Sequence, residues 1–170
     1  TRAVEFAADS EKEYIAGLEL GVVTNTQDTS GEVLEERPVT VTRAELEAIL
    51  ALFRGEILQV PPMYSAIKIQ GRKLYELARA GKEVERSPRP VTIHELELLD
   101  EQRARAASPY GFAPAPDTWF LRVRCSKGTY VRTLCHDIGA ALGCGGCMSA
   151  LRRTEAGGFA LSDAVPLEEV

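Results

Sequence analysis

The chain has 170 residues, 45% of them hydrophobic, and a formal net charge of −5. This size and composition suit one globular domain with a hydrophobic core, and no apolar run is long enough to span a membrane. The N-terminus lacks the basic-then-apolar pattern of a secretion signal, so we expect a cytoplasmic protein with no membrane partner. Because the chain starts with Thr1 rather than Met, we also expect it to begin inside a longer protein.

The first part of the chain predicts a strand, a loop and a helix. Residues 13–20 alternate between polar and apolar side chains, which indicates a half-buried strand. Residues 21–31 are rich in Thr, Asn, Asp, Ser and Gly, which are typical of a structured loop. Thr42 and Glu45 form a capping box ahead of an apolar helical pattern, and Gly55 ends that helix.

The middle of the chain predicts shorter elements. The proline pair at 61–62 favours extended backbone, so we expect a strand over 63–69. A short helix is predicted over 73–80 and a strand over 91–99. Residues 103–117 are rich in Ala and Pro without periodicity, which indicates a surface insertion between two strands.

The last part of the chain predicts a strand, a helix and a second strand. Residues 121–126 alternate, Gly128 interrupts the alternation, and a helical pattern begins at Val131. A basic strand is expected around 151–153. Because strands and helices follow one another without a regular β-α-β rhythm, we predict an α+β fold. Its central sheet would be mixed or largely antiparallel and flanked by helices.

Tyr130 and Arg132 stand where the strand changes into the helix. Such junctions are common binding sites, and an arginine there needs an anionic partner. No acidic residue lies between Asp117 and Asp137, so the partner must come from elsewhere in the protein or from a ligand.

Basic residues gather in two stretches of this acidic chain, 61–90 and 122–133. They are Lys68, Arg72, Lys73, Arg79, Lys82, Arg86 and Arg89 in the first, and Arg122, Arg124, Lys127 and Arg132 in the second. Two local stretches favour a focused site for a polyanion, although solvated protein surface is an equal alternative.

Metal and cofactor motifs are missing from the sequence. Cys144 and Cys147 form a C-x-x-C, but neither a second such pair nor a pair of nearby histidines accompanies it, so we expect reduced thiols rather than zinc. No phosphate-binding loop, dinucleotide fingerprint or nucleophile elbow occurs. The remaining candidates are aromatic and basic residues, which stack bases and hold phosphates: Tyr14, Tyr64, Lys68, Tyr75, Tyr130 and Arg132. Tyr75, on an amphipathic helix, is better explained as a core residue.

The sequence resembles the bacterial tRNA pseudouridine synthases that modify the T-loop uridine, and the resemblance covers almost the whole chain. The matching motifs are Lys12-x-Tyr14, Gly21-x-x-Thr24-x-Thr26-x-Asp28-x-x-Gly31, Pro61-Pro62-Met63-Tyr64-Ser65-Ala66-Ile67-Lys68, Gly71-x-Lys73-Leu74-Tyr75, Ser126-Lys127-Gly128-Thr129-Tyr130-Val131-Arg132-Thr133 and Leu151-Arg152-Arg153-Thr154. The resemblance implies the pseudouridine synthase catalytic fold, action on the T-stem-loop of tRNA as a monomer, and no cofactor or metal. It also implies that the target uridine is flipped out, detached, rotated and rejoined through carbon.

The resemblance also implies roles for individual residues. Tyr14 would stack on the flipped base and Arg132 would pair with the catalytic aspartate; we take these two as the catalytic residues of this chain. Tyr130 would contact the base edge through its backbone, and Leu151 would form an apolar wall. The remaining substrate-binding candidates, which would grip the RNA, are Tyr64, Lys68, Lys73 and Lys127.

Two parts of the family pattern are missing from residues 1–170. No motif before Tyr14 matches the one that holds the nucleophilic aspartate, so the N-terminal part of the catalytic domain is expected upstream of Thr1. The C-terminal RNA-binding extension of many members is also absent, so residues 1–170 are predicted to be a partial catalytic domain. The alternative function is a non-catalytic RNA-binding or tRNA-folding module that uses the same surface.

Overall fold

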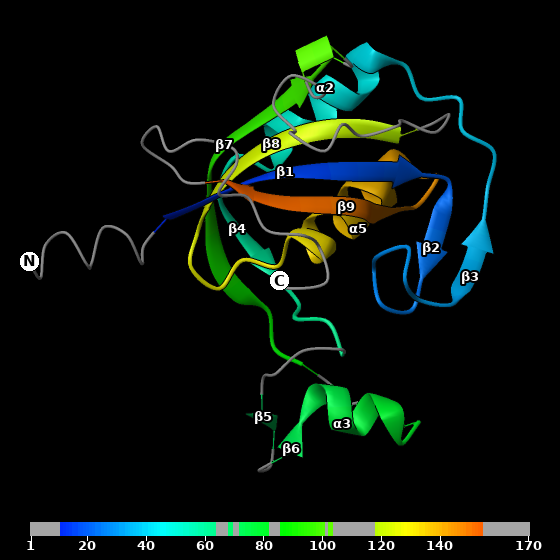
Figure 1. Ribbon diagram of the computed structural model, residues 1–170, viewed down its shortest axis with the longest axis vertical. Coiled ribbons are helices and arrows are strands. Elements are labelled where there is room, and N and C mark those ends of the chain that lie inside the picture. The colour runs from blue at the N-terminus through cyan, green and yellow to red at the C-terminus, as the bar shows by residue number, and fades with distance from the viewer. Residues whose placement is uncertain are drawn as a thin grey trace, which may run out of the picture.

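The computed structural model describes residues 11–63, 68–69, 72–81, 86–100, 102–103 and 118–154. Its named elements, labelled as in Figure 1, are β1 (Glu11–Leu20), β2 (Val22–Thr24), β3 (Val33–Glu36), α2 (Arg43–Leu52), β4 (Gly55–Gln59), β5 (Lys68–Ile69), β6 (Arg72–Lys73), α3 (Leu74–Arg79), β7 (Arg89–Leu99), β8 (Thr118–Ser126), α5 (Val131–Leu142) and β9 (Gly146–Thr154).

Five strands form the central sheet in the order β4-β7-β8-β1-β9, and every neighbouring pair is antiparallel. The predicted α+β class with a largely antiparallel sheet is therefore confirmed. β1 lies inside the sheet because it pairs with β8 on one side and with β9 on the other. Two smaller ribbons, β2-β3 and β5-β6, complete the described strands.

One face of the sheet carries the main core, and α2 and α5 cover it (Figure 1). Both helices are amphipathic: Leu46 and Leu50 of α2, and Leu134 and Ile138 of α5, have no exposed surface. Burying a leucine or isoleucine side chain stabilises a fold by about 1.5–3 kcal/mol. These apolar stripes therefore fix the two helices on the sheet.

The predicted capping box at the start of α2 is confirmed. The hydroxyl of Thr42 accepts a hydrogen bond from the backbone N–H of Glu45 at 3.2 Å, and Glu45 Oε1 accepts one from the Thr42 N–H at 3.0 Å. The first turn of α2 thus satisfies N–H groups that have no partner within the helix.

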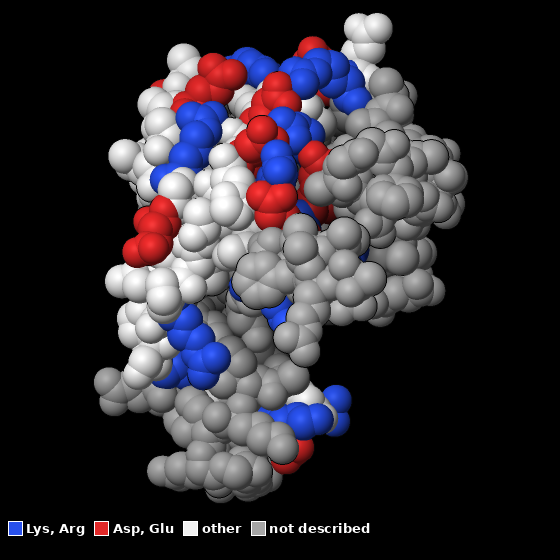
Figure 2. Space-filling model, turned by 90° about the vertical axis from the view of Figure 1, so that its left-hand side faces the viewer, with Lys and Arg blue, Asp and Glu red and all other residues white. Residues whose placement is uncertain are grey.

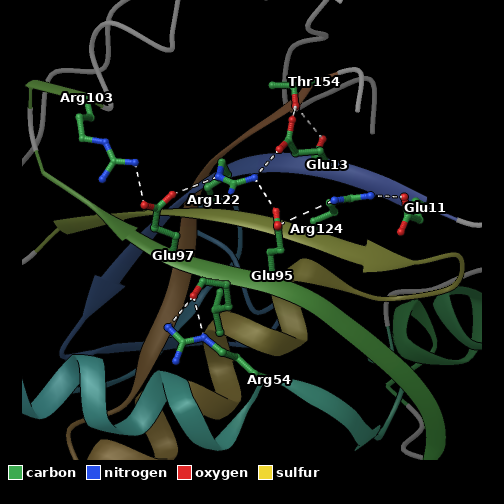
Figure 3. Close-up of polar contacts among 10 residues, drawn as sticks. Glu11, Glu13, Arg54, Glu95, Glu97, Arg103, Arg122, Arg124 and Thr154 are labelled. Atoms are coloured by element: carbon green, nitrogen blue, oxygen red, sulfur yellow. Dashed lines mark hydrogen bonds and ion pairs between the residues drawn. The ribbon is translucent and has the colours of Figure 1, made fainter. Parts of the chain in front are cut away.

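The opposite face of the sheet carries charged residues beside a small apolar cluster of Ile15, Leu99 and Phe120. Figure 3 shows Arg122 of β8 between carboxylates of both neighbouring strands. It donates through Nη1 to Glu13 Oε1 at 2.7 Å and to Glu95 Oε2 at 2.8 Å, and through Nε to Glu97 Oε1 at 3.2 Å. These contacts join β7, β8 and β1 across the sheet.

The short elements β5, β6 and α3 lie apart from the five-stranded sheet, at the bottom of Figure 1. They belong to the segment between β4 and β7, residues 60–88, which we call the excursion. The predicted short helix is confirmed as α3, and Gly81 follows it with φ 74°, a left-handed conformation that favours glycine. Of the strand predicted over 63–69, residues 64–67 lie outside the described part of the chain.

The predicted strands over 13–20, 91–99 and 121–126 are confirmed as β1, β7 and β8, and the helix from Val131 as α5. The basic strand expected around 151–153 begins earlier, at Gly146, because residues 146–150 also pair with β1. β2, β3 and β4 were not predicted. Most of the proposed insertion, residues 104–117, lies outside the described residues. No helix in the described part of the chain is long and apolar enough to cross a membrane.

Candidate active site and RNA-binding residues

Tyr14 and Leu151 lie close together on the core face of the sheet. In the β1-β9 register Tyr14 is opposite Arg153, and Ala16 is opposite Leu151, so Tyr14 and Leu151 are diagonal neighbours. Leu151 is buried, and the half-buried Tyr14 packs against the same core. Burial is the main reason why the pKa of the Tyr14 phenol is raised, so its ring is neutral at physiological pH.

Tyr130 is the N-cap residue of α5, with extended backbone (φ −98°, ψ 107°) and no side-chain cap bond of its own. The amide of Gln59 holds its main chain instead. The Tyr130 N–H donates to Gln59 Oε1 at 3.0 Å, and Gln59 Nε2 donates to the Tyr130 carbonyl oxygen at 3.2 Å. Gln59 ends β4, so a residue that the sequence analysis did not single out fixes the start of α5.

Arg132 lies in the first turn of α5, next to the loop that follows β2. Its Nη1 donates to the carbonyl oxygen of Thr26 at 3.3 Å, and the hydroxyl of Thr133 donates to Gln27 Oε1 at 2.7 Å. Gln27 has φ 68°, an uncommon conformation for a residue with a side chain. The loop over 25–31 is therefore anchored on the helix that presents Arg132.

The side chain of Asp28 forms hydrogen bonds within this loop. Its Oδ1 accepts hydrogen bonds from the Thr26 hydroxyl at 2.7 Å and from the Ser30 N–H at 3.0 Å. Its main chain forms a bridge with Met148 of β9. Asp28 is buried, which agrees with the expectation of a structured, polar loop in this region.

The structure makes Tyr14 and Leu151 neighbours on β1 and β9, and it describes the side chains of two of the four residues expected to grip RNA, Lys73 and Lys127. β1 and β9 pair with each other, and Tyr14, Leu151 and Val131 of α5 belong to one core cluster. Lys127 is exposed in the turn between β8 and α5. The side chains of Tyr64 and Lys68 lie outside the described part of the structure.

Lys73 and Tyr75 lie in the excursion. Lys73 is the N-cap residue of α3, and its Nζ stands 5.5 Å from the centre of the Tyr75 ring. Arg79 stands 5.0 Å from the same ring. Tyr75 is half-buried, and two cations contact its ring.

The interpretation of 122–133 as one basic stretch is wrong for Arg122 and Arg124. Both are paired with carboxylates of neighbouring strands: Arg122 with Glu13, Glu95 and Glu97, and Arg124 with Glu11 and Glu95. Figure 2 shows acidic and basic atoms interleaved over this upper part of the surface. In the lower part, toward α3, most of the visible charged atoms of described residues belong to Lys and Arg. Among the described residues, fewer carboxylates therefore accompany the visible basic side chains toward α3 than those on the sheet.

All four cysteines are buried free thiols. Burial is the largest cause of the raised pKa values of three of them: about 11 for Cys125, about 12 for Cys147, and also raised for Cys135. The described residues contain no group of three or more His, Cys, Asp or Glu side chains that could hold a metal ion.

Family models cover the whole chain. The N-terminal domain of the TruB family of pseudouridylate synthases matches residues 1–131, and the C-terminal domain of tRNA pseudouridylate synthase B matches residues 132–170. The boundary falls in the first turn of α5. Because α5 and β9 share the core of the sheet with β1, the described residues on both sides of this boundary form one unit.

Similar proteins and structures agree with these matches. The chain is 52% identical to tRNA pseudouridine synthase B of Pseudomonas putida over all 170 residues, and 52% identical to that of Azoarcus sp. over 168. It spans about half the length of these curated relatives, 52% of each.

Two solved structures share the fold. A crystal structure of a Cbf5-Nop10-Gar1 complex matches 91% of this chain and 32% of its own chain, with a TM-score of 0.56 and 28% identity. An H/ACA RNP bound to a substrate RNA containing 2'-deoxyuridine matches 92% of this chain and 32% of its own, with a TM-score of 0.51 and 25% identity. The chain therefore belongs to the TruB family of pseudouridylate synthases.

Proposed function

We propose that the protein containing this chain isomerises uridine to pseudouridine in the T-loop of tRNA. The observation that carries the proposal is that Tyr14, Leu151 and Val131, the residue between Tyr130 and Arg132, pack in one core cluster. These residues match the family motif at positions far apart in the sequence. Their grouping supports a single site for an extruded base.

The reaction needs no external reagent because it is an isomerisation. The bond from the ribose to the uracil nitrogen breaks, the detached uracil rotates, and a bond from the ribose to a uracil carbon forms. That carbon then loses its hydrogen as a proton and the freed nitrogen gains one, so the atoms balance. Extruding a base costs a few kcal/mol of stacking, and an aromatic ring can return about 1–3 kcal/mol of it. The half-buried position of Tyr14 beside Leu151 supports this role.

Arg132 would act on the nucleophilic aspartate, which we expect from the segment upstream of residue 1. A guanidinium beside a carboxylate lowers the pKa of that carboxylate and keeps it ionised for attack. The contact of Arg132 with the Thr26 carbonyl oxygen would hold the guanidinium in place.

Lys73, Lys127, Lys68 and Tyr64 would bind the T-stem-loop away from the reacting base. Lysine contacts to phosphate make binding dependent on salt concentration. Residues 1–170 are proposed to be part of the catalytic domain, and the whole protein to act as a cytoplasmic monomer. No step of this mechanism calls for a cofactor.

The test uses the complete protein and a T-stem-loop RNA, with an anticodon stem-loop as the control RNA. We expect pseudouridine only in the T-stem-loop, at the conserved loop uridine, read out by carbodiimide labelling and primer extension. Binding without product would instead support the RNA-binding or tRNA-folding module. Residues 1–170 alone should form no product because the family motif with the nucleophile is missing from them.

A further inference from the structure

Gln59 links the end of β4, where the excursion begins, to Tyr130 at the start of α5. Its side chain is buried, with 2% of its surface exposed, although it is a polar amide. Buried amides need hydrogen-bond partners, and Gln59 spends both its oxygen and one N–H on the main chain of a single residue, Tyr130. The two bonds span 71 positions of sequence.

The geometry resembles one rung of a β-ladder, made by a side chain instead of a strand. The Tyr130 carbonyl oxygen also accepts from the Leu134 N–H at 3.0 Å, which is the first helical bond of α5. Tyr130 provides no cap through its own side chain. Gln59 therefore fixes both the peptide plane of Tyr130 and the point where the helix begins.

The contact between Gln59 and Tyr130 also lies at the start of the excursion. Gln59 is the last residue of β4, and the excursion over 60–88 starts directly after it. That segment holds Lys73 and the cation-flanked ring of Tyr75. One side chain thus stands between the segment proposed to grip RNA and the backbone proposed to meet the base.

We propose that Gln59 is a positioning residue for the isomerisation, a role that rests on the proposed function. It holds the Tyr130 main chain in the orientation that contacts the uracil edge. Because Gln59 ends β4, it also fixes the position of this main chain relative to the start of the excursion. Gln59 itself touches neither base nor phosphate in this role. Misplacing a substrate-positioning group by about 1 Å can cost on the order of 10²-fold in rate.

The alternative is that Gln59 only stabilises the fold. A purely structural role would lower the melting temperature and reduce activity through the folded fraction alone. A positioning role also lowers kcat in protein that is fully folded, while the Kd for RNA changes little. These two roles are separable by comparing variants of equal stability.

The experiment uses the complete protein with Gln59→Met, which keeps the length of the side chain and removes both hydrogen bonds. The control is Thr42→Ala, which weakens the cap of α2 and leaves the Gln59–Tyr130 contact intact. We expect Gln59→Met to lower kcat by about 10²-fold and to change the RNA Kd by less than about 3-fold. A kcat equal to that of Thr42→Ala, at a temperature where both are folded, would overturn the proposal.

A second variant, Gln59→Glu, tests the hydrogen bonds themselves. An ionised carboxylate accepts from the Tyr130 N–H but repels the Tyr130 carbonyl oxygen, whereas the protonated acid offers an acceptor and a donor as the amide does. Burial raises the pKa of the introduced carboxyl, so activity relative to wild type should rise as the pH falls from about 8 to about 6. Gln59→Met should show no such rise, and a flat ratio for Gln59→Glu would count against the proposal.

Amide hydrogen exchange separates this inference from the proposed function. If the wild-type protein forms no pseudouridine, the proposed function fails, and the Tyr130 N–H decides the structural claim. Faster exchange at Tyr130 in Gln59→Met than in Thr42→Ala, at equal global stability, supports the local role of Gln59. Equal exchange in the two variants refutes it.

Discussion

Arg132 donates a hydrogen bond from Nη1 to the carbonyl oxygen of Thr26 at 3.3 Å, across 106 positions of sequence. The next residue of α5, Thr133, bonds the side chain of Gln27 in the same loop at 2.7 Å. The start of α5 is thus held from two sides, by this loop and by Gln59 of β4. The guanidinium is attached to a fixed part of the fold.

Arg132→Ala tests the assignment of this guanidinium to catalysis. In the complete protein we expect kcat to fall by at least about 10²–10³-fold, because the nucleophile loses a pre-oriented charge partner. The Kd for the T-stem-loop should stay within a few-fold of wild type. Pseudouridine formation and filter binding are the two measurements.

The matched control for this variant is Lys127→Ala, which removes an exposed cation four residues before the helix turn that carries Arg132. It should weaken binding and reduce its salt dependence while leaving kcat nearly unchanged. Equal losses of binding and turnover in Arg132→Ala would show that Arg132 holds phosphate instead.

Thr42→Ala should destabilise the protein through the N-terminus of α2. The Thr42 hydroxyl satisfies the Glu45 N–H, and losing such a cap costs about 1 kcal/mol of unfolding free energy. Urea denaturation measures the change. Thr40→Ala, at an exposed position two residues earlier, is the control and should change the unfolding free energy by less than about 0.5 kcal/mol.

Arg122→Ala should destabilise the sheet at neutral pH. Burial alone would lower the pKa of the Arg122 guanidinium, but the hydrogen bonds that it donates to Glu13, Glu97 and Glu95 outweigh burial and raise that pKa. Removing Arg122 leaves three carboxylates facing one another on β1 and β7, and we expect a loss of about 1–2 kcal/mol. The control Arg37→Ala, which removes an exposed ion pair with Glu35, should reduce the unfolding free energy by less.

The pH dependence of the stability of Arg122→Ala follows from the lowered pKa of its partner Glu97. The hydrogen bond from Arg103 is the largest of the effects that lower the pKa of Glu97, and Arg122 adds to it. The stabilisation is therefore present above the unfolded-state pKa of Glu97 and is lost as the pH falls through its lower folded-state pKa. The difference in unfolding free energy between wild type and Arg122→Ala should become smaller in this acidic range. A difference that grows there would contradict a stabilising role for the ion pairs of Arg122.

The four cysteines should be unreactive in the folded protein. Buried thiols with pKa values of about 11 for Cys125 and about 12 for Cys147 carry almost no thiolate at pH 8. Ellman's reagent should modify them only in denaturant, whereas a Lys127→Cys variant should react at once at its exposed position. Stoichiometric release of zinc on unfolding would instead support a metal role for the C-x-x-C.

The sequence predicted the long amphipathic elements because each contains its own pattern. Apolar side chains alternate along β1, β8 buries alternate residues over 121–125, and α5 buries Val131, Leu134 and Ile138 at helical spacing, so a single chain segment reveals each element. β2 and β4 have three and five residues, too few for a period to emerge. Short strands depend on their neighbours in the sheet, which local patterns do not identify.

The same distinction explains the candidate site. Tyr14, Tyr130, Arg132 and Leu151 were found because whole motifs carry them. The carboxylate partners of Arg122 and Arg124 were missed because pairing across a sheet joins residues such as Glu13 and Arg122, 109 positions apart. Gln59 gave no signal beyond standing just before a proline pair, because its role depends on a contact with a distant main chain.

The interior position of β1 has a consequence for how this chain folds. β1 is the first described strand, yet both of its neighbours, β8 and β9, are made more than 90 residues later. During synthesis on the ribosome it has neither of its native strand partners until residues 118–154 have emerged. Such non-local pairing slows folding, because the chain loses the entropy of closing a long loop before the stabilising contacts between the strands form. The strand that carries Tyr14 thus joins the sheet late, and the ring of Tyr14 reaches its place only when most of these 170 residues have been made.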